Sequence, residues 1–146
     1  MPRRLEQWRA LPLGEQIRLA QLAALMPMIA GAVRVAGVRR TYRAMGRMRR
    51  DVRVKTHVGD ADRAHAERLG RLIDIASRHG TTKATCLPQS LALWWLLRRR
   101  GLPAELRIGV AKPDGRMSAH AWVELDGRAV NDHADVAERY APYPGL

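Results

Sequence analysis

The apolar positions of this chain change their spacing close to residue 104. Before that point, apolar residues recur every three or four positions, which is the spacing of helices with one buried face. After it, apolar and polar residues alternate, as they do in strands that are buried on one side only. A run of helices followed by an antiparallel meander predicts an α+β fold.

Residues 13–48 begin the helical part and are unusually apolar. Pro27 lies in the middle of this stretch. Because proline has no backbone N–H and clashes with the preceding turn, we expect it to end or kink a helix. The stretch is therefore expected to form two helices, at about 13–26 and 28–48.

The same stretch approaches the length of a membrane span, which needs about 20 apolar residues. Leu19–Val38 contains only Gln21 and Arg34 as strongly polar residues. Pro27, Arg34 and the alanine and glycine content argue against a span. We expect the two helices to pack on the core or on a partner, with peripheral contact to a membrane surface as the alternative.

Two further helices precede the strands. Asp60 is a good N-cap for a helix over about 61–79, and Gly80 would end it. The next helix is expected over about 86–100, because Thr85 can be its N-cap and its last turn is basic. Its apolar residues share one face, so we expect it to be buried.

Three strands and two turns account for most of the remainder. We expect strands over about 105–111, 119–125 and 128–132, from the alternation of apolar residues. Residues 112–115 form a turn, and the dipeptide Asp126-Gly127 is a strong signal for a two-residue hairpin loop. The tail after residue 132 is expected to be a loop.

The length and cysteine content limit the class of protein. A chain of 146 residues forms one domain, here an apolar, arginine-rich helical region over 1–55 followed by a core over 56–146. Its one cysteine excludes an internal disulfide and a cysteine-rich metal site, and it fits a reducing, cytoplasmic setting. Glu6 and Glu15 interrupt the N-terminus before any apolar run, so no secretory signal is expected.

The net charge of +12 is concentrated in the first half of the chain. A basic cluster there is opposed only by Asp51; it consists of Arg39, Arg40, Arg43, Arg47, Arg49, Arg50, Arg53 and Lys55. Such a cluster can bind an acidic protein, an anionic lipid or nucleic acid, or it can simply be a solvated face. No nucleic-acid recognition motif accompanies it, so nucleic acid is not expected as a partner.

The single cysteine, Cys86, stands at the expected start of the helix over 86–100. Thiolates are stabilised at helix N-termini, and the free N–H groups there can stabilise an oxyanion. His120 and Asp132 follow on the expected strands, so a nucleophile, a base and an orienting group are all available. The competing interpretation of Cys86 is a small thiol buried in the core.

The partner of His120 is left open by the strand register. If Asp126 and Gly127 are the loop residues, His120 lies opposite His133, and ideal alternation turns Asp132 to the other face. A bulge or a break at Asn131 would bring Asp132 to the histidine; without one, His133 is the rival partner.

Metal binding is the competing use of the histidines. They show no short paired spacing, and they are His57, His65, His79, His120 and His133. We therefore expect neither a metal site nor a cofactor.

Four motifs between residues 84 and 132 resemble a known family. They are Cys86–Leu93, Leu97–Ala104, Leu106–Val110 and His120–Gly127. In their order and spacing they resemble the lasso peptide leader peptidase, the cysteine-protease half of the lasso peptide B-protein family. The resemblance covers about a third of the chain, and the N-terminal region is similar to the family only in composition.

The resemblance implies a fold and a function. The fold would be a transglutaminase-like or papain-like core, in which the nucleophile begins a helix packed on a small antiparallel sheet, preceded by N-terminal helices. The family removes the leader from a ribosomally made precursor peptide. Carried over by position, Cys86 is the nucleophile, His120 the base and Asp132 the orienting group, so the resemblance predicts an irregular strand near Asn131.

The resemblance also implies partners. Many family members carry a fused leader-recognition domain, for which 146 residues leave no room. A stand-alone protease would need the precursor peptide, a separate leader-recognition protein and an asparagine-synthetase-like cyclase that acts on the product. Two alternatives stay open: transglutaminase-like acyl transfer to an amine, and a non-catalytic basic adaptor that binds a peptide, a partner enzyme or a membrane.

Overall fold

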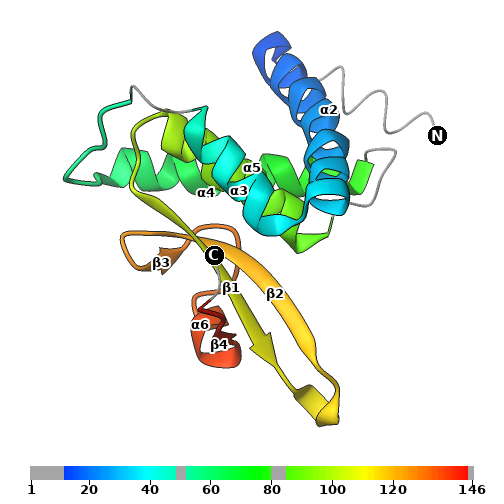
Figure 1. The fold of residues 1–146 in the computed structure, drawn as a ribbon. Coiled ribbons are helices and arrows are strands. Elements are labelled where there is room, and N and C mark those ends of the chain that lie inside the picture. The colour runs from blue at the N-terminus through cyan, green and yellow to red at the C-terminus, as the bar shows by residue number, and fades with distance from the viewer. Residues whose placement is uncertain (1–11, 49–51, 80–84, 145–146) are drawn as a thin grey trace.

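The computed structural model describes residues 12–48, 52–79 and 85–144 and confirms an α+β fold (Figure 1). Helices come first in the chain: α2 (Leu13–Ala36), α3 (Val38–Arg47), α4 (Asp60–His79) and α5 (Cys86–Arg99). The strands follow: β1 (Ala104–Ala111), β2 (Ser118–Leu125), β3 (Arg128–Ala129) and β4 (Ala141–Pro142). A short 3-10 turn, η1 (Pro113–Gly115), joins β1 to β2, and helix α6 (Val136–Arg139) precedes β4.

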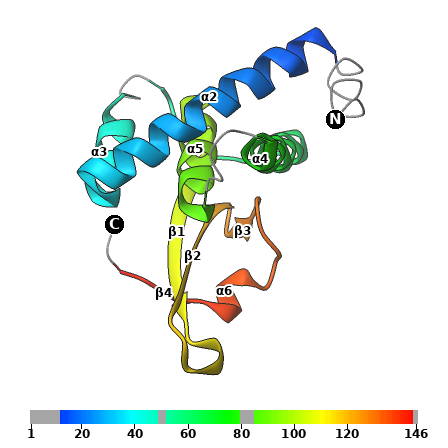
Figure 2. The same ribbon diagram turned by 90° about the vertical axis from the view of Figure 1, so that its right-hand side faces the viewer.

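Helix α5 lies between the sheet and the other helices. The sheet is antiparallel with the order β3-β2-β1-β4, and α5 packs on β1 and β2. Helices α2 and α4 pack on α5 and on each other. Leu91, Leu93 and Leu97 of α5 are fully buried as a result. The far half of the β1–β2 hairpin extends beyond α2, α3, α4 and α5 (Figure 2).

Helix α2 passes through Pro27 without ending, so the expected break there is wrong. A proline costs a helix about 3 kcal/mol. The buried side chains on both sides of it, which include Leu22, Met26 and Ile29, contribute about 1.5–3 kcal/mol each. The chain breaks instead at Gly37, whose φ of 82° is readily available only to glycine.

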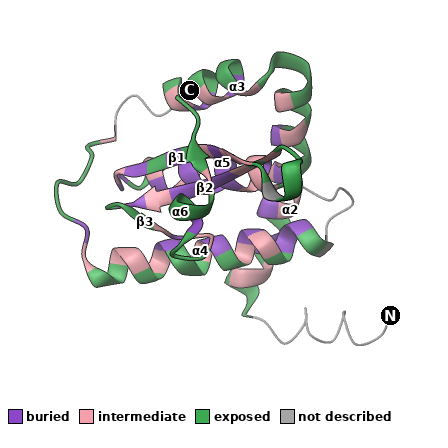
Figure 3. Ribbon diagram, turned by 90° about the horizontal axis from the view of Figure 1, so that it is seen from below, coloured by how far each residue is buried: buried purple, intermediate pink, exposed green. Residues whose placement is uncertain are grey.

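Helix α2 is long and apolar enough to cross a membrane by length and composition alone. Only 22% of its most apolar 18-residue stretch is buried, and large side chains such as Leu13 and Val35 are exposed. Figure 3 shows the exposed residues along α2 and α3. This is weak evidence for membrane association, because the core helices of soluble proteins can be equally long and apolar. One face of α2 does belong to the core.

The strand region follows the expected plan with two corrections. The Asp126-Gly127 turn is confirmed, and both residues have the positive φ of a type I′ hairpin (55° and 72°). Strand β3 ends at Ala129 and does not reach Asp132. The tail is not a plain loop, because it forms α6 and then β4, which pairs with β1.

Helix α4 begins one residue earlier than expected. Asp60 is its first residue and not its N-cap; Asp62 accepts a hydrogen bond from Gly59 N–H at 3.4 Å instead. The expected stop at Gly80 lies outside the described residues, as do Glu6, Arg49, Arg50 and Asp51.

Candidate active site

Cys86 is the first residue of α5, as the sequence predicts. Thr85 before it is extended (φ −70°, ψ 170°), which is the conformation of an N-cap, although its side chain makes no capping hydrogen bond. Pro88 is tolerated in this first turn because the N–H it lacks would have no partner there. The thiol is free and half-buried, so it is neither a fully buried core side chain nor part of a disulfide.

The structure brings His120 and Asp132 together. His120 Nε2 contacts Asp132 Oδ2, and the side chains are 24% and 15% exposed. The ring of His120 also packs on Tyr140, with 5.1 Å between the ring centroids, and on Trp122 at 6.3 Å. These aromatic contacts restrict the orientation of the imidazole.

A break in the strand at Asn131 turns Asp132 towards His120. Val130 N–H donates to the Val123 carbonyl at 3.0 Å, as in a regular ladder. In a regular ladder Val123 N–H would donate to the Val130 carbonyl. It donates instead to the side chain of Asn131, to Oδ1 at 2.8 Å. The irregular strand that the resemblance requires is therefore present, and Asp132 leaves the alternation of β2 and β3.

His133, the rival partner, is exposed. Its backbone N–H donates to Asp132 Oδ1 at 2.7 Å, and Arg139 lies 3.5 Å from the same oxygen. Both contacts fix one oxygen of the carboxylate and leave the other for His120.

Ser90 ties α5 to this region, and the sequence reasoning missed it. Its hydroxyl is fully buried, donates to the Ala121 carbonyl at 2.9 Å and accepts from Asn131 Nδ2 at 3.0 Å. One side chain thus connects the residue after His120 with the residue before Asp132. The available signal was a serine among the apolar residues of a buried helix.

The direction of α5 places Cys86 at the level of His120. Helix α5 and β2 run the same way, because α5 ends next to Ala104, which pairs with Leu125 at the end of β2. Cys86 lies one turn before Ser90, which is about 6 Å along the helix axis. Because Ser90 contacts Ala121, Cys86 lies at the level of the residues that precede Ala121 in β2. Within the described residues, no hydrogen bond joins the thiol to His120.

Comparison with known families identifies the superfamily of the chain. A model of the transglutaminase-like superfamily matches residues 28–144. The chain belongs to this superfamily, which includes cysteine peptidases and acyltransferases. No curated protein and no solved structure matches the chain.

The strand position opposite His120 has room only for glycine. Gly109 on β1 pairs with His120. A Cβ at this position would lie 2.7 Å from Tyr140 Cβ and 3.0 Å from the Trp122 ring. The Tyr140 Cβ and the Trp122 ring therefore occupy the space that any larger residue would need. Tyr140 was also missed by the sequence reasoning, because the tail carries no periodic pattern.

The remaining chemical groups of this transglutaminase-like chain are dispersed. Among the described residues, no three histidine, cysteine or acidic side chains lie together as a metal site would need. The described part of the basic cluster lies on exposed surface, including Arg39, Arg43 and Arg47 of α3. Lys55 is paired with Asp62 at 2.8 Å.

Replacing Asn131 with alanine is expected to lower the free energy of unfolding by about 1–3 kcal/mol, because Val123 N–H and the Ser90 hydroxyl each lose a partner. Urea denaturation measures this change. Asn131→Asp is the matched control, since it keeps the acceptor for Val123 N–H and loses only the donor to Ser90. An unfolding free energy of Asn131→Ala equal to that of the wild type would contradict the structural role of this side chain.

Proposed function

We propose that this chain is a cysteine peptidase that removes the leader from a ribosomally synthesised lasso peptide precursor. One observation carries the proposal: a histidine–carboxylate pair is tied, through Ser90 and Asn131, to the helix that begins with the only cysteine. Superfamily membership supports acyl chemistry at that cysteine. The motif resemblance described above supports leader removal as its purpose.

The contact with Asp132 supports Nδ1 of His120 as the base. An ionised carboxylate can only accept hydrogen bonds, so Nε2 carries the hydrogen of the neutral ring. The lone pair then lies on Nδ1, which takes the proton of the Cys86 thiol. Asp132 holds this tautomer and stabilises the imidazolium that forms.

The reaction proceeds in two acyl transfers. The thiolate attacks the carbonyl carbon of the leader–core junction, and backbone N–H groups at the start of α5 stabilise the oxyanion. The C–N bond breaks as His120 returns its proton to the departing amine of the core. A water molecule then gives a proton to His120 and attacks the thioester. The leader leaves with a free carboxylate, and the thiol is restored.

Acyl transfer to an amine is the second candidate, and superfamily membership supports it. The thiolate would attack the amide of a glutamine side chain, and ammonia would leave. An amine would then take the acyl group from the thioester in place of water. The same cysteine and histidine would act, so only the products tell the two reactions apart.

Incubation of the chain with its precursor peptide and the leader-binding protein tests the proposal. Mass spectrometry is expected to find separate leader and core whose summed mass exceeds that of the precursor by one water. A crosslinked product that has lost ammonia would establish the transferase instead. Salt-sensitive binding of the precursor without any new product would establish the basic adaptor.

The proposal includes partners and a location. The substrate is the precursor peptide, a separate protein presents its leader, and an asparagine-synthetase-like cyclase uses the released core. A free thiol nucleophile suits the reducing cytoplasm. The exposed apolar side chains of α2, beside the arginines of α3, support peripheral contact with a membrane.

A further inference from the structure

A cavity lies where α2, α4 and α5 meet, on the side of α5 away from the sheet. Its volume is about 420 Å³. The residues that line it include Arg18, Leu22, His65, Trp95, Arg99 and Arg100. It shares no lining residue with the Cys86, His120 and Asp132 region.

The charged groups at this cavity are all positive. Within the part of the chain that the structure describes, Arg18, Arg99 and Arg100 form no ion pair. The nearby acidic side chains already form ion pairs: Glu15 pairs with Arg68, and Asp62 pairs with Lys55. The three guanidinium groups therefore remain available to an anion.

Two further polar groups at the cavity lack partners. His65 Nε2 and Trp95 Nε1 are buried, and neither has a hydrogen-bond partner within the described residues. Burial lowers the pKa of His65, and the positive charges of Arg100 and Arg18 lower it further, against a smaller opposing effect of Asp62. The positive potential of the arginines thus reaches the interior of the cavity, where an anion would be stabilised.

The walls of the cavity are aliphatic. Leu22, Leu25, Leu69 and Leu96 line it, and the Arg99 guanidinium lies 4.7 Å from the centre of the Trp95 ring. A bare inorganic anion would leave these walls without contacts. The cavity therefore suits a negative group that is attached to an aliphatic body.

We propose that this cavity is an exosite for a glutamate or aspartate flanked by aliphatic residues in the peptide substrate. The identity of the substrate as a peptide rests on the proposed function. Trp95 lies nine residues after Cys86 on the same helix, which is about 14 Å along the axis. An extended peptide covers that distance with about four residues. The acidic residue would thus lie at least about four residues from the scissile bond.

Fluorescence anisotropy with synthetic peptides tests the exosite without requiring cleavage. The probe is a fluorescein-labelled Gly-Leu-Glu-Leu-Glu-Leu-Gly peptide, and its twin carries glutamine in place of both glutamates. The wild-type chain is expected to bind the glutamate peptide at least about tenfold more tightly than the twin. Equal affinity for the two peptides would overturn the proposal.

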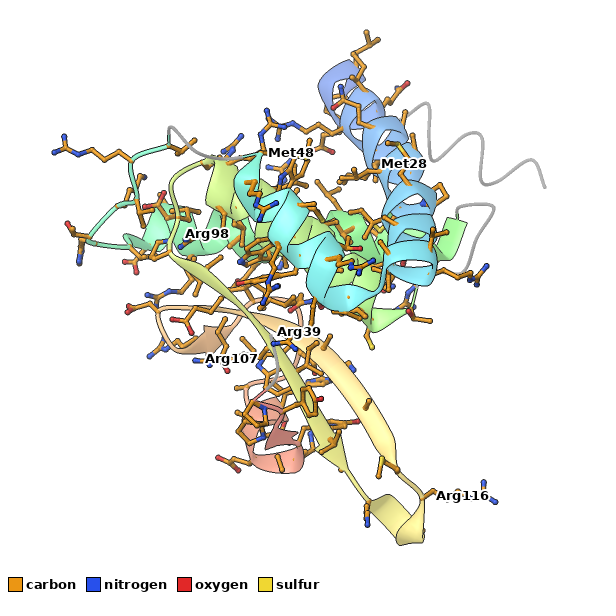
Figure 4. All side chains as sticks on the ribbon, in the orientation of Figure 1. Met28, Arg39, Met48, Arg98, Arg107 and Arg116 are labelled. Carbon is orange, nitrogen blue, oxygen red and sulfur yellow. The ribbon has the colours of Figure 1, made fainter. Side chains whose placement is uncertain are left out.

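Paired charge variants locate the binding. The double variant Arg18→Gln/Arg100→Gln is expected to weaken binding of the glutamate peptide about tenfold or more. The matched control is Lys112→Gln/Arg116→Gln, which removes the same charge at the hairpin tip, far from the helices (Figure 4). An equal loss in both double variants would show a non-specific effect of net charge and would overturn the exosite.

Sodium acetate and phosphatidylglycerol vesicles test whether the cavity binds a simple anion or a lipid surface instead of the peptide. If sodium acetate displaces the labelled peptide as well as unlabelled peptide does at equal concentration, only charge is recognised and the aliphatic part of the proposal is wrong. If phosphatidylglycerol vesicles bind through Arg18 and Arg100 while the peptide does not, the surface binds lipid and the proposal is overturned.

Kinetics separate the exosite from the proposed function. With a cleavable precursor, Arg18→Gln/Arg100→Gln is expected to raise KM about tenfold and to leave kcat unchanged, because the cavity holds substrate away from the bond that breaks. A fall in kcat with unchanged KM would overturn the exosite. Glutamate-specific binding without any cleavage would sustain the exosite and refute the peptidase.

Discussion

Replacing Cys86 with alanine is expected to reduce cleavage of the precursor by at least about 10³-fold, because no other group can form the acyl intermediate. The fold should be unchanged, since the thiol is half-buried and belongs to no disulfide. Thr85→Ala is the matched control, because that exposed side chain makes no capping hydrogen bond. Liquid chromatography of the leader and thermal unfolding of each variant measure both effects.

Alkylation gives an independent measurement of the same thiol. The chain has one cysteine, so Cys86 is the one thiol that stoichiometric iodoacetamide can alkylate, and the loss of activity should match the labelled fraction. His120→Ala is expected to slow the labelling, because the thiol loses the base that takes its proton. Leader release by Cys86→Ala, or full activity after complete labelling, would refute the nucleophile.

The elements that carry strong local signals could be predicted from the sequence. Helix α5 begins at Cys86 because an N-cap residue, an early proline and an apolar face agree there. The β1–β2 pair and the Asp126-Gly127 turn follow from alternation and from positive φ. Pro27 misled the prediction because the core contacts of α2, which no local rule describes, outweigh the lost hydrogen bond.

The candidate catalytic residues could be predicted from the sequence, but most of the residues that hold them in position could not. The sequence alone left the choice between Asp132 and His133 open, and the resemblance favoured Asp132 together with an irregular strand at Asn131. The structure contains that irregularity and the contact of Asp132 with His120. The roles of Ser90 and Tyr140 could not be predicted, because their contacts cross distant parts of the chain.

The cavity between α2, α4 and α5 illustrates the same limit. Arg99 and Arg100 belong to one short run of arginines, and Arg18 is remote from them along the chain. Only the packing of the three helices brings them to one opening. The basic cluster over residues 39–55 contributes none of these three residues, so the proposed anion site could not be located from that cluster.

Replacing Asp132 with asparagine is expected to reduce kcat/KM about 10²–10⁴-fold, as much as Asp132→Ala does. The new amide oxygen would keep the hydrogen bond from His133 N–H and would turn its NH₂ group towards His120 Nε2. Two donors cannot face each other, so the ring would move its hydrogen to Nδ1 and could no longer accept the proton of Cys86. Nitrogen-15 NMR of the imidazole distinguishes the two tautomers. His133→Gln is the control and should keep full activity; loss of activity in that variant with a fully active Asp132→Asn would show that His133 orients the base.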